Sequence, residues 1–277
     1  MKNIALIGGD ERMLHLYNEL KNKANVNFYA FKDFEYNNDE IKNMDIIILP
    51  IISSLDNENL FTPNYKEKIP INTFCKDIKS AKIIIGGKIH PIIKNNTNTK
   101  LIEYINDSDF KRKNAIPTAE AAIALMTFNH KKSINDSKCL IVGFGEIGRY
   151  LSKILLDLGA EITVSARKEK DFEDLSNSNI DYIHTCEINE HLNKYDVIFN
   201  TVPFRVFDEE KLKKLKQDQL IIDLASYPYG LNHNTAYNCS IILASSLPGK
   251  YSPISASKII IDTIKKILKE VNSNAKI

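Results

Sequence analysis

The chain contains no apolar run that approaches the ~20 residues needed to cross a bilayer. Its first residues, MKNIALIGGDER, lack the long apolar region and small-residue cleavage site of a signal peptide. The net charge is only +2, from 37 basic and 35 acidic residues, so no overall field attracts nucleic acid or a membrane. We therefore expect a cytoplasmic protein that binds neither nucleic acid nor membrane.

Metal and disulfide patterns are also absent. The four cysteines, Cys75, Cys139, Cys186 and Cys239, are far apart in the sequence and form no CxxC motif. We expect them to be buried, reduced thiols. The six histidines show no HxxxH or HxH spacing, so the sequence predicts no metal site.

What the chain does contain is Ile-rich strand patterns that alternate with helical patterns. Continuous apolar strands are typical of a parallel sheet covered by helices on both faces. In the first half we expect strands at 3–7, 26–31, 45–50, 81–87 and 101–105. In the second half we expect strands at 139–142, 161–165, 181–184, 196–200, 220–224 and 240–244. The predicted fold class is α/β, with two doubly wound parallel-sheet domains, the second a Rossmann NAD(P)-binding domain, and an interdomain cleft.

The domain boundary is expected next to Pro117. We assign residues 1–116 to a flavodoxin-like or Rossmann-like substrate domain and 117–277 to a Rossmann NADP-binding domain. Proline suits the first turn of a helix and alanines follow it, so a helix is predicted at 117–131. This helix and an amphipathic helix at 253–271 are expected to lie between the two domains.

The most informative motif is GFGEIG, which an apolar strand precedes and a helical pattern follows. This is the context that a dinucleotide-binding fingerprint requires. Gly143 would allow the tight turn, Gly145 the approach of the backbone to a pyrophosphate, and Gly148 the close packing of helix on strand. The helix N-terminus would supply free N–H groups to the phosphates. The predicted cofactor-binding residues here are Gly143, Phe144, Gly145, Glu146, Ile147 and Gly148.

The end of the next strand indicates which nucleotide binds. NAD-binding folds place an acidic residue there, on the adenosine ribose. This chain has Ser165, Ala166, Arg167 and Lys168 instead. An arginine can pair bidentately with a 2′-phosphate that a carboxylate would repel, so we predict NADP.

Polar turns follow three other strands at the edge where ligands of parallel sheets collect. Thr201, Val202, Pro203 and Ala225 are predicted to line the ribose and nicotinamide side of the cofactor. Gly8-Gly9-Asp10 lacks the third glycine of a fingerprint, and we interpret it as a strand-end turn that faces a substrate.

Several motifs in this order resemble those of the A subunits of dipicolinate synthases. They are Gly8-Gly9-Asp10 with Arg12, residues 115–120 (AIPTAE), 143–148 (GFGEIG), Ala166-Arg167, 223–226 (DLAS) and 247–250 (LPGK). The chain departs from the family pattern at 227–230, where it reads Tyr-Pro-Tyr-Gly and Lys-Pro-Gly-Gly is commoner. It departs again at 254–257, where it reads Ile-Ser-Ala-Ser and Thr-Ala-Gly is expected.

The resemblance implies NADP-linked oxidation of a dihydrodipicolinate-level precursor to dipicolinate in the mother cell of a sporulating bacterium. It also implies that the partner is the flavoprotein-like B subunit of dipicolinate synthase, and a homodimer is compatible with it. The substrate is a small dicarboxylate, so its site needs cations and hydrogen-bond donors. The candidate substrate-binding residues are Arg12, Ser53, Ser54, Arg112, Thr118 and Lys250, and the candidate catalytic residues are Glu120, Asp223 and Ser226. His90, which precedes a proline, is interpreted as a helix start and not as a base.

Two other functions remain open from the sequence. One is a 2-hydroxyacid-dehydrogenase-like oxidoreductase, for which Arg205 would supply the arginine, while the late His233 has a turn as its simpler role. The other is a non-catalytic nucleotide-binding scaffold, because no general base stands out.

Overall fold

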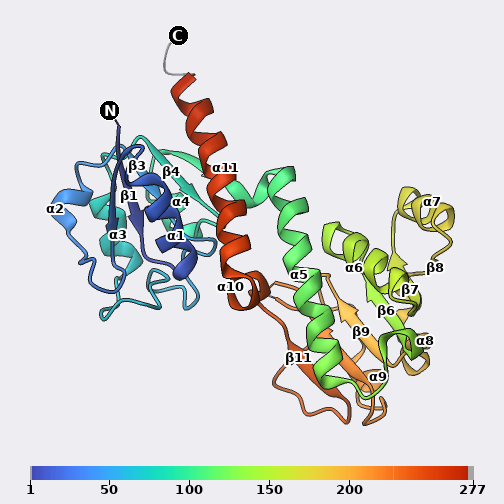
Figure 1. The fold of residues 1–277 in the computed structure, drawn as a ribbon. Coiled ribbons are helices and arrows are strands. Elements are labelled where there is room, and N and C mark those ends of the chain that lie inside the picture. The colour runs from blue at the N-terminus through green and yellow to red at the C-terminus, as the bar shows by residue number, and fades with distance from the viewer. Residues whose placement is uncertain (1, 227, 274–277) are drawn as a thin grey trace. The chain divides into compact units, whose positions relative to one another are not determined.

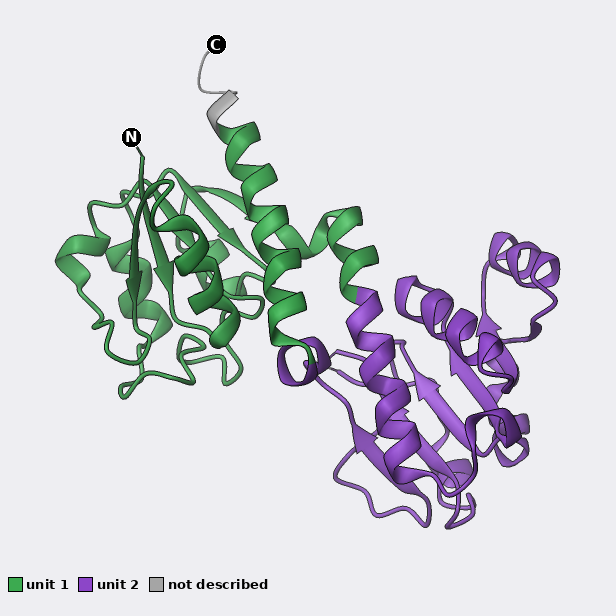
Figure 2. Cartoon of the chain, viewed as in Figure 1, with its two compact units in different colours: residues 1–114, 252–277 green, residues 115–251 purple. Residues whose placement is uncertain are grey.

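The computed structural model describes residues 2–226 and 228–273. The chain forms two compact units, with residues 1–114 and 252–277 in unit 1 and residues 115–251 in unit 2 (Figure 2). Each unit is built on one parallel sheet, which confirms the predicted fold class. None of the described helices is both long and apolar enough to span a membrane.

Unit 1 contains a five-stranded sheet with the order β2-β1-β3-β4-β5. Its strands β1, β3 and β4 are labelled in Figure 1. Its strands are β1 (Asn3–Ile7), β2 (Asn25–Tyr29), β3 (Ile46–Ile48), β4 (Ile83–Gly86) and β5 (Lys100–Glu103). Its shorter helices are α1 (Glu11–Leu20), α2 (Asn38–Ile41), α3 (Ile71–Asp77) and α4 (Pro91–Asn95). All neighbouring strands are parallel, and the order is that of flavodoxin-like folds. Alternate strand residues bury themselves on opposite faces, so the sheet has one apolar core on each side.

The last helix, α11 (Pro253–Ser273), belongs to unit 1, whereas the sequence pattern assigns it to the second domain. Four of its apolar residues, spaced at alternating intervals of four and three, join the core formed by β1 and α1; they are Ile260, Ile264, Ile267 and Val271. Lys265 also forms an ion pair with Glu19 of α1 at 2.6 Å. An amphipathic stripe predicts that a helix is half-buried but not which sheet buries it.

Unit 2 contains a six-stranded parallel sheet with the order β11-β10-β9-β6-β7-β8, which is the Rossmann order. Its strands are β6 (Lys138–Val142), β7 (Glu161–Ala166), β8 (Asp181–His184), β9 (Val197–Asn200), β10 (Leu220–Asp223) and β11 (Ser240–Leu243). Its helices include α6 (Glu146–Asp157), α7 (Glu169–Asn177), α8 (Ile188–His191), α9 (Glu209–Leu212) and α10 (Leu247–Tyr251). The carboxyl ends of β6, β9 and β10 therefore lie next to one another.

Helix α5 (Ser108–Asn129) contains residues of both units and begins earlier than predicted. Asp107 caps it, because its Oδ1 accepts a hydrogen bond from the Phe110 N–H at 2.9 Å. Pro117 lies inside the helix and not in its first turn. A proline there removes one donor without ending the helix, so the local signal places the start of the helix wrongly.

The cysteines differ from expectation at one position. Cys75, Cys139 and Cys239 are buried, but Cys186 is exposed. It follows β8, the edge strand of its sheet, where no further strand of the described chain covers it.

Candidate functional site

The glycine loop between β6 and α6 has the geometry that a dinucleotide fingerprint needs. Gly143 has a φ of +96°, and a Cβ there would lie 2.7 Å from Thr201 Oγ1. Gly148 packs directly on the Gly143 carbonyl. Gly145, the N-cap of α6, has open space where its Cβ would be. Two glycines therefore shape the turn, and the third leaves room for a ligand above the helix N-terminus.

Arg149 braces this loop and is not free to bind a phosphate. Its guanidinium pairs with Asp171 and Asp174 of α7 at 2.7 and 2.8 Å. The same group lies over the Phe144 ring, 4.1 Å from the ring centre. The phosphates of a cofactor would thus meet backbone N–H groups of α6 and not the guanidinium of Arg149.

The end of β7 carries two unpaired cations. Arg167 and Lys168 are exposed, and no carboxylate within residues 2–226 and 228–273 forms an ion pair with either. Ser165 is fully buried, and its Oγ has no hydrogen-bond partner among the described residues. Thr185 fixes the strand end by donating from Oγ1 to the Ala166 carbonyl at 3.0 Å. The residues present fit a phosphate group on the adenosine ribose.

The turn after β9 is held against the glycine loop. Thr201 donates from both its backbone N and its Oγ1 to the Val142 carbonyl, at 3.0 and 2.8 Å. The Asn200 side chain spans the turn, because its Nδ2 donates to the Val202 carbonyl and its Oδ1 accepts from the Val202 N–H. Pro203 follows as an exposed residue.

Asp223, at the end of β10, is a buried anchor. Its Oδ1 accepts from Asn200 Nδ2 at 2.8 Å and from the Ala225 N–H at 3.2 Å. Its Oδ2 accepts from the Gly230 N–H at 3.1 Å and from His233 Nε2 at 2.9 Å. The residue is 0% exposed, so this carboxylate holds the backbone and is not placed to take a proton from a substrate.

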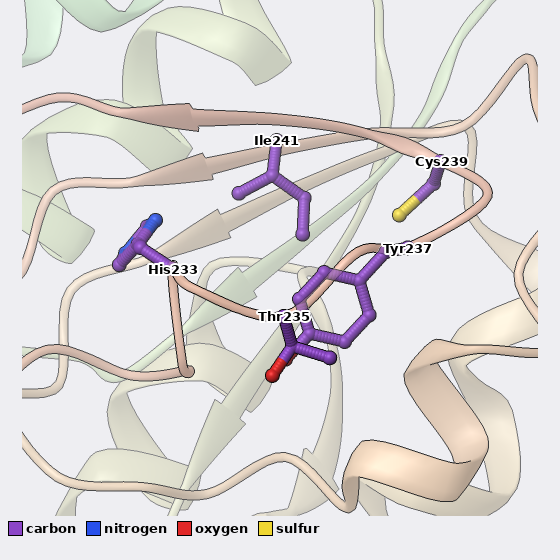
Figure 3. A pocket seen from close by; sticks show the side chains of 5 residues that line it. All are labelled: His233, Thr235, Tyr237, Cys239 and Ile241. Carbon is purple, nitrogen blue, oxygen red and sulfur yellow. The ribbon is translucent and has the colours of Figure 1, made fainter.

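His233, which the sequence assigns to a turn, is a further candidate for a functional residue. It lines a cavity of about 240 Å³ together with Thr235, Tyr237, Cys239 and Ile241 (Figure 3). Its partner Asp223 lies across a loop, so no local spacing rule reveals the pair. The only sequence signal is a late histidine after a strand-end acid.

The other predicted residues of unit 2 vary in exposure. Ser226 and Glu120 are exposed, and so is Lys250 on α10. Thr118 is only 7% exposed and already has an interaction partner. Glu120 and Lys250 therefore have the accessible charges that binding or proton transfer needs.

In unit 1, the turn after β1 has the expected strand-end geometry. Gly8 and Gly9 have φ values of +58° and +87°, and Asp10 caps α1. Arg12, however, is 6% exposed and already pairs with Asp10, from Nε to Oδ1 at 2.9 Å and from Nη2 to Oδ2 at 2.7 Å. Its guanidinium supports Asp10 and is not free for a second carboxylate.

Ser53 joins the turns after β3 and β4. Its buried Oγ donates to the Lys88 carbonyl at 3.2 Å and accepts from the His90 N–H at 2.8 Å. His90 caps α4 through Nδ1, which confirms its predicted role as a helix start. Ser54 donates to Asp56 at 3.4 Å. Arg112 is not brought to this edge by any contact in the described residues and pairs with Asp109 within α5 at 2.7 Å.

Comparison with known proteins matches each half of the chain to a different domain model. Residues 3–106 match the N-terminal domain of the dipicolinate synthase A subunit. Residues 115–226 match the NAD-binding domain of D-isomer specific 2-hydroxyacid dehydrogenases. The second match shows a dehydrogenase-type domain for a nicotinamide cofactor and does not distinguish NADP from NAD.

Whole-chain relatives agree with the first match. The dipicolinate synthase A subunit of Bacillus subtilis (strain 168) is 28% identical, over 98% of this chain and 97% of that protein. The crystal structure of dipicolinate synthase, A chain, from B. subtilis superposes with a TM-score of 0.86 at 26% identity, over 99% of this chain and 97% of that one. The crystal structure of the A subunit from Bacillus halodurans also gives 0.86, at 24% identity over 96% and 97% of the chains, and shows the shared fold. The chain is thus similar to dipicolinate synthase A subunits over almost its full length, which confirms the resemblance that its motifs indicate.

Proposed function

We propose that this chain is the NADP-dependent oxidoreductase subunit of a dipicolinate synthase. It would oxidise a dihydrodipicolinate-level precursor to dipicolinate, together with a flavoprotein-like B subunit. Two features of the same sheet edge carry the proposal. One is the open space beside Gly145, the N-cap of α6, and the other is the exposed cations Arg167 and Lys168 at the end of β7, which form no ion pair among the described residues. A diphosphate and a second phosphate would both find donors on this edge.

Unit 2 would hold the cofactor along the carboxyl edge of its sheet. The backbone of 143–148 would receive the pyrophosphate, and Arg167 with Lys168 the 2′-phosphate. Thr201 to Pro203 and Ala225 would line the nicotinamide side, because they follow β9 and β10. Bound NADP would accept a hydride.

The oxidation removes two hydrogens from the ring. One leaves as a hydride with its bonding electrons, and the other leaves as a proton to a base of the protein. The exposed carboxylate of Glu120 is the acceptor that we propose, since Asp223 is buried and fully hydrogen-bonded. The product ring is aromatic, which makes the oxidation favourable.

Unit 1 is proposed as the substrate domain. Ser53 and Ser54 supply hydroxyls at the carboxyl edge of its sheet, while Arg12 acts by fixing Asp10. A dicarboxylate substrate needs accessible cations, and Arg112 is an exposed cation of this unit, where it pairs with Asp109. The exposed Lys250 is a separate candidate in unit 2. In unit 2, the exposed Ser226 is proposed as a hydrogen-bond donor, whereas Thr118 is buried and already has a partner.

The test is dipicolinate formation by the purified chain with and without the B subunit. We expect precursor and NADP to yield dipicolinate and NADPH when both subunits are present. Absence of product with both subunits, while cofactor binds, would favour the scaffold role instead.

A second candidate is a 2-hydroxyacid-dehydrogenase-like enzyme, favoured by the domain match over 115–226. A panel of 2-hydroxy acids with NAD and NADP separates the two functions. Reduction of cofactor by a 2-hydroxy acid at rates above those with the precursor would replace the first proposal by this one.

A further inference from the structure

A buried polar network joins the two turns proposed to receive the nicotinamide half of the cofactor. Asn200 Nδ2 bonds both the Val202 carbonyl, in the turn after β9, and Asp223 Oδ1, at the end of β10. Asp223 in turn accepts from the Ala225 N–H. Asn200 and Asp223 are both 0% exposed, so each hydrogen bond is shielded from water and sensitive to loss.

His233 completes this network from the far end of the following loop. Its Nε2 and the Gly230 N–H share Asp223 Oδ2, at 2.9 and 3.1 Å. The His233 side chain is 18% exposed and closes the loop back onto the strand end. Without the His233 N–H, the fully buried Asp223 Oδ2 would keep a single donor, the Gly230 N–H.

The loop between Asp223 and His233 also stores backbone strain at Tyr229. This residue has a φ of +67°, a conformation that favours glycine. Its ring lies edge-on to the His233 imidazole, with 5.4 Å between centroids and 88° between planes. Gly230 has no room for a side chain, because a Cβ there would collide with the Asn200 amide. Strain at a strand-end turn persists only where the surroundings fix it, and it is concentrated at functional sites.

We propose that His233 is a positioning residue for the nicotinamide half of the cofactor. Through Asp223 it fixes the backbone at Ala225 and Gly230, and through Asn200 it aligns the turn at 201–203. Its effect should be largest at the ring end of the site, because the described residues contain no direct hydrogen bond from the network to Gly145 or Arg167, and the turn meets the glycine loop through Thr201 and the Val142 carbonyl. The inference rests on the proposed function, since it assumes that a nicotinamide cofactor binds on this edge.

The test compares two ligands that share every group except the nicotinamide ring, which one of them lacks. NADPH and 2′-phospho-ADP-ribose are titrated by calorimetry against the full-length chain. Two variants separate the hydrogen bond from the packing: His233→Phe keeps a ring but has no N–H, and His233→Gln keeps a donor but has no ring. His15→Gln, at an exposed position of α1, is the matched control.

We expect His233→Phe to weaken NADPH binding about tenfold, the fold-change that corresponds to ~1.4 kcal/mol. The affinity for 2′-phospho-ADP-ribose should stay within about twofold of wild type, because loss of the His233–Asp223 hydrogen bond should not change the groups that contact the phosphates. His233→Gln should restore NADPH affinity to within about threefold, because its amide N–H can replace the lost donor.

Three results would overturn the inference. The first is equal weakening of both ligands in His233→Phe, which marks a general loss of structure. The second is unchanged NADPH affinity in that variant, and the third is no rescue by His233→Gln. A wild-type chain that binds neither ligand would instead refute the proposed cofactor, so failure of the function and failure of the inference are distinguishable.

Discussion

Gly145→Ala should weaken cofactor binding by about 100-fold while leaving the fold intact. A Cβ at this position meets no atom of the protein within 4 Å, so the new methyl group causes no clash in the free chain. It does occupy the space over the N-terminus of α6 that a diphosphate needs. The expected cost to stability is that of alanine at an N-cap, about 1 kcal/mol.

The expected cost to binding is larger. A displaced diphosphate would lose about two hydrogen bonds of the charge-assisted kind, each worth ~1.5–3 kcal/mol. The lower limit of this sum, about 3 kcal/mol, corresponds to a loss of affinity of roughly 100-fold. NADPH fluorescence titration measures the affinity, and thermal unfolding measures the stability, for which we expect a decrease in Tm of about 5 °C or less.

Gly159→Ala is the matched control for this experiment. Gly159 follows the other end of α6 and has a φ of +86°, so alanine there is strained. This variant should lose stability, by about 1–2 kcal/mol, and keep its affinity for NADPH. Wild-type affinity in Gly145→Ala, or a loss of affinity in both variants, would refute the assignment of the diphosphate to this loop.

Three further predictions concern charge. Arg167→Asp should reverse cofactor preference from NADPH towards NADH, since a carboxylate repels the 2′-phosphate; equal ratios of the two Kd values before and after would contradict this. Asp223→Asn should lower the free energy of unfolding in urea by about 3 kcal/mol, because an amide N–H would face the donors that the carboxylate now accepts from. Burial lowers the pKa of His130 below its ordinary 6.5, so the neutral form is favoured in the folded state and stability falls as the pH drops below that value. In His130→Gln this part of the pH dependence should vanish, and an unchanged slope of unfolding free energy against pH would disprove it.

Local sequence signals predict the sheets well. The strands at 3–7 and 181–184 have the predicted bounds, and the other strands shift by only a few residues at their ends. An apolar run followed by a glycine turn predicts a buried strand and the residue at which it ends, because both features depend on residues close together in the sequence. The turn geometry of Gly143 and the packing of Gly148 follow from the same short motif.

Long-range partners could not be predicted in the same way. The stripe of α11 indicates burial, but its contact with α1 depends on residues more than 200 positions apart in the chain, such as Glu19 and Lys265. Arg12 has the sequence context of a free cation, yet Asp10 neutralises it in the folded chain. Asp223 has the sequence position of a catalytic acid, but in the fold it accepts hydrogen bonds from Gly230 and His233. The loop that contains these two residues has no periodic sequence pattern that would predict the contacts.

We propose that this chain couples the formation of dipicolinate to the reduction of NADP. The most direct test is the stoichiometry of the reconstituted pair of subunits, with dipicolinate and NADPH quantified in the same reaction. We expect equal amounts of the two products, with NADP preferred over NAD and with turnover about 100-fold lower in Gly145→Ala at NADP concentrations below KM. Dipicolinate that forms without NADPH, or at the same rate in Gly145→Ala, would contradict it.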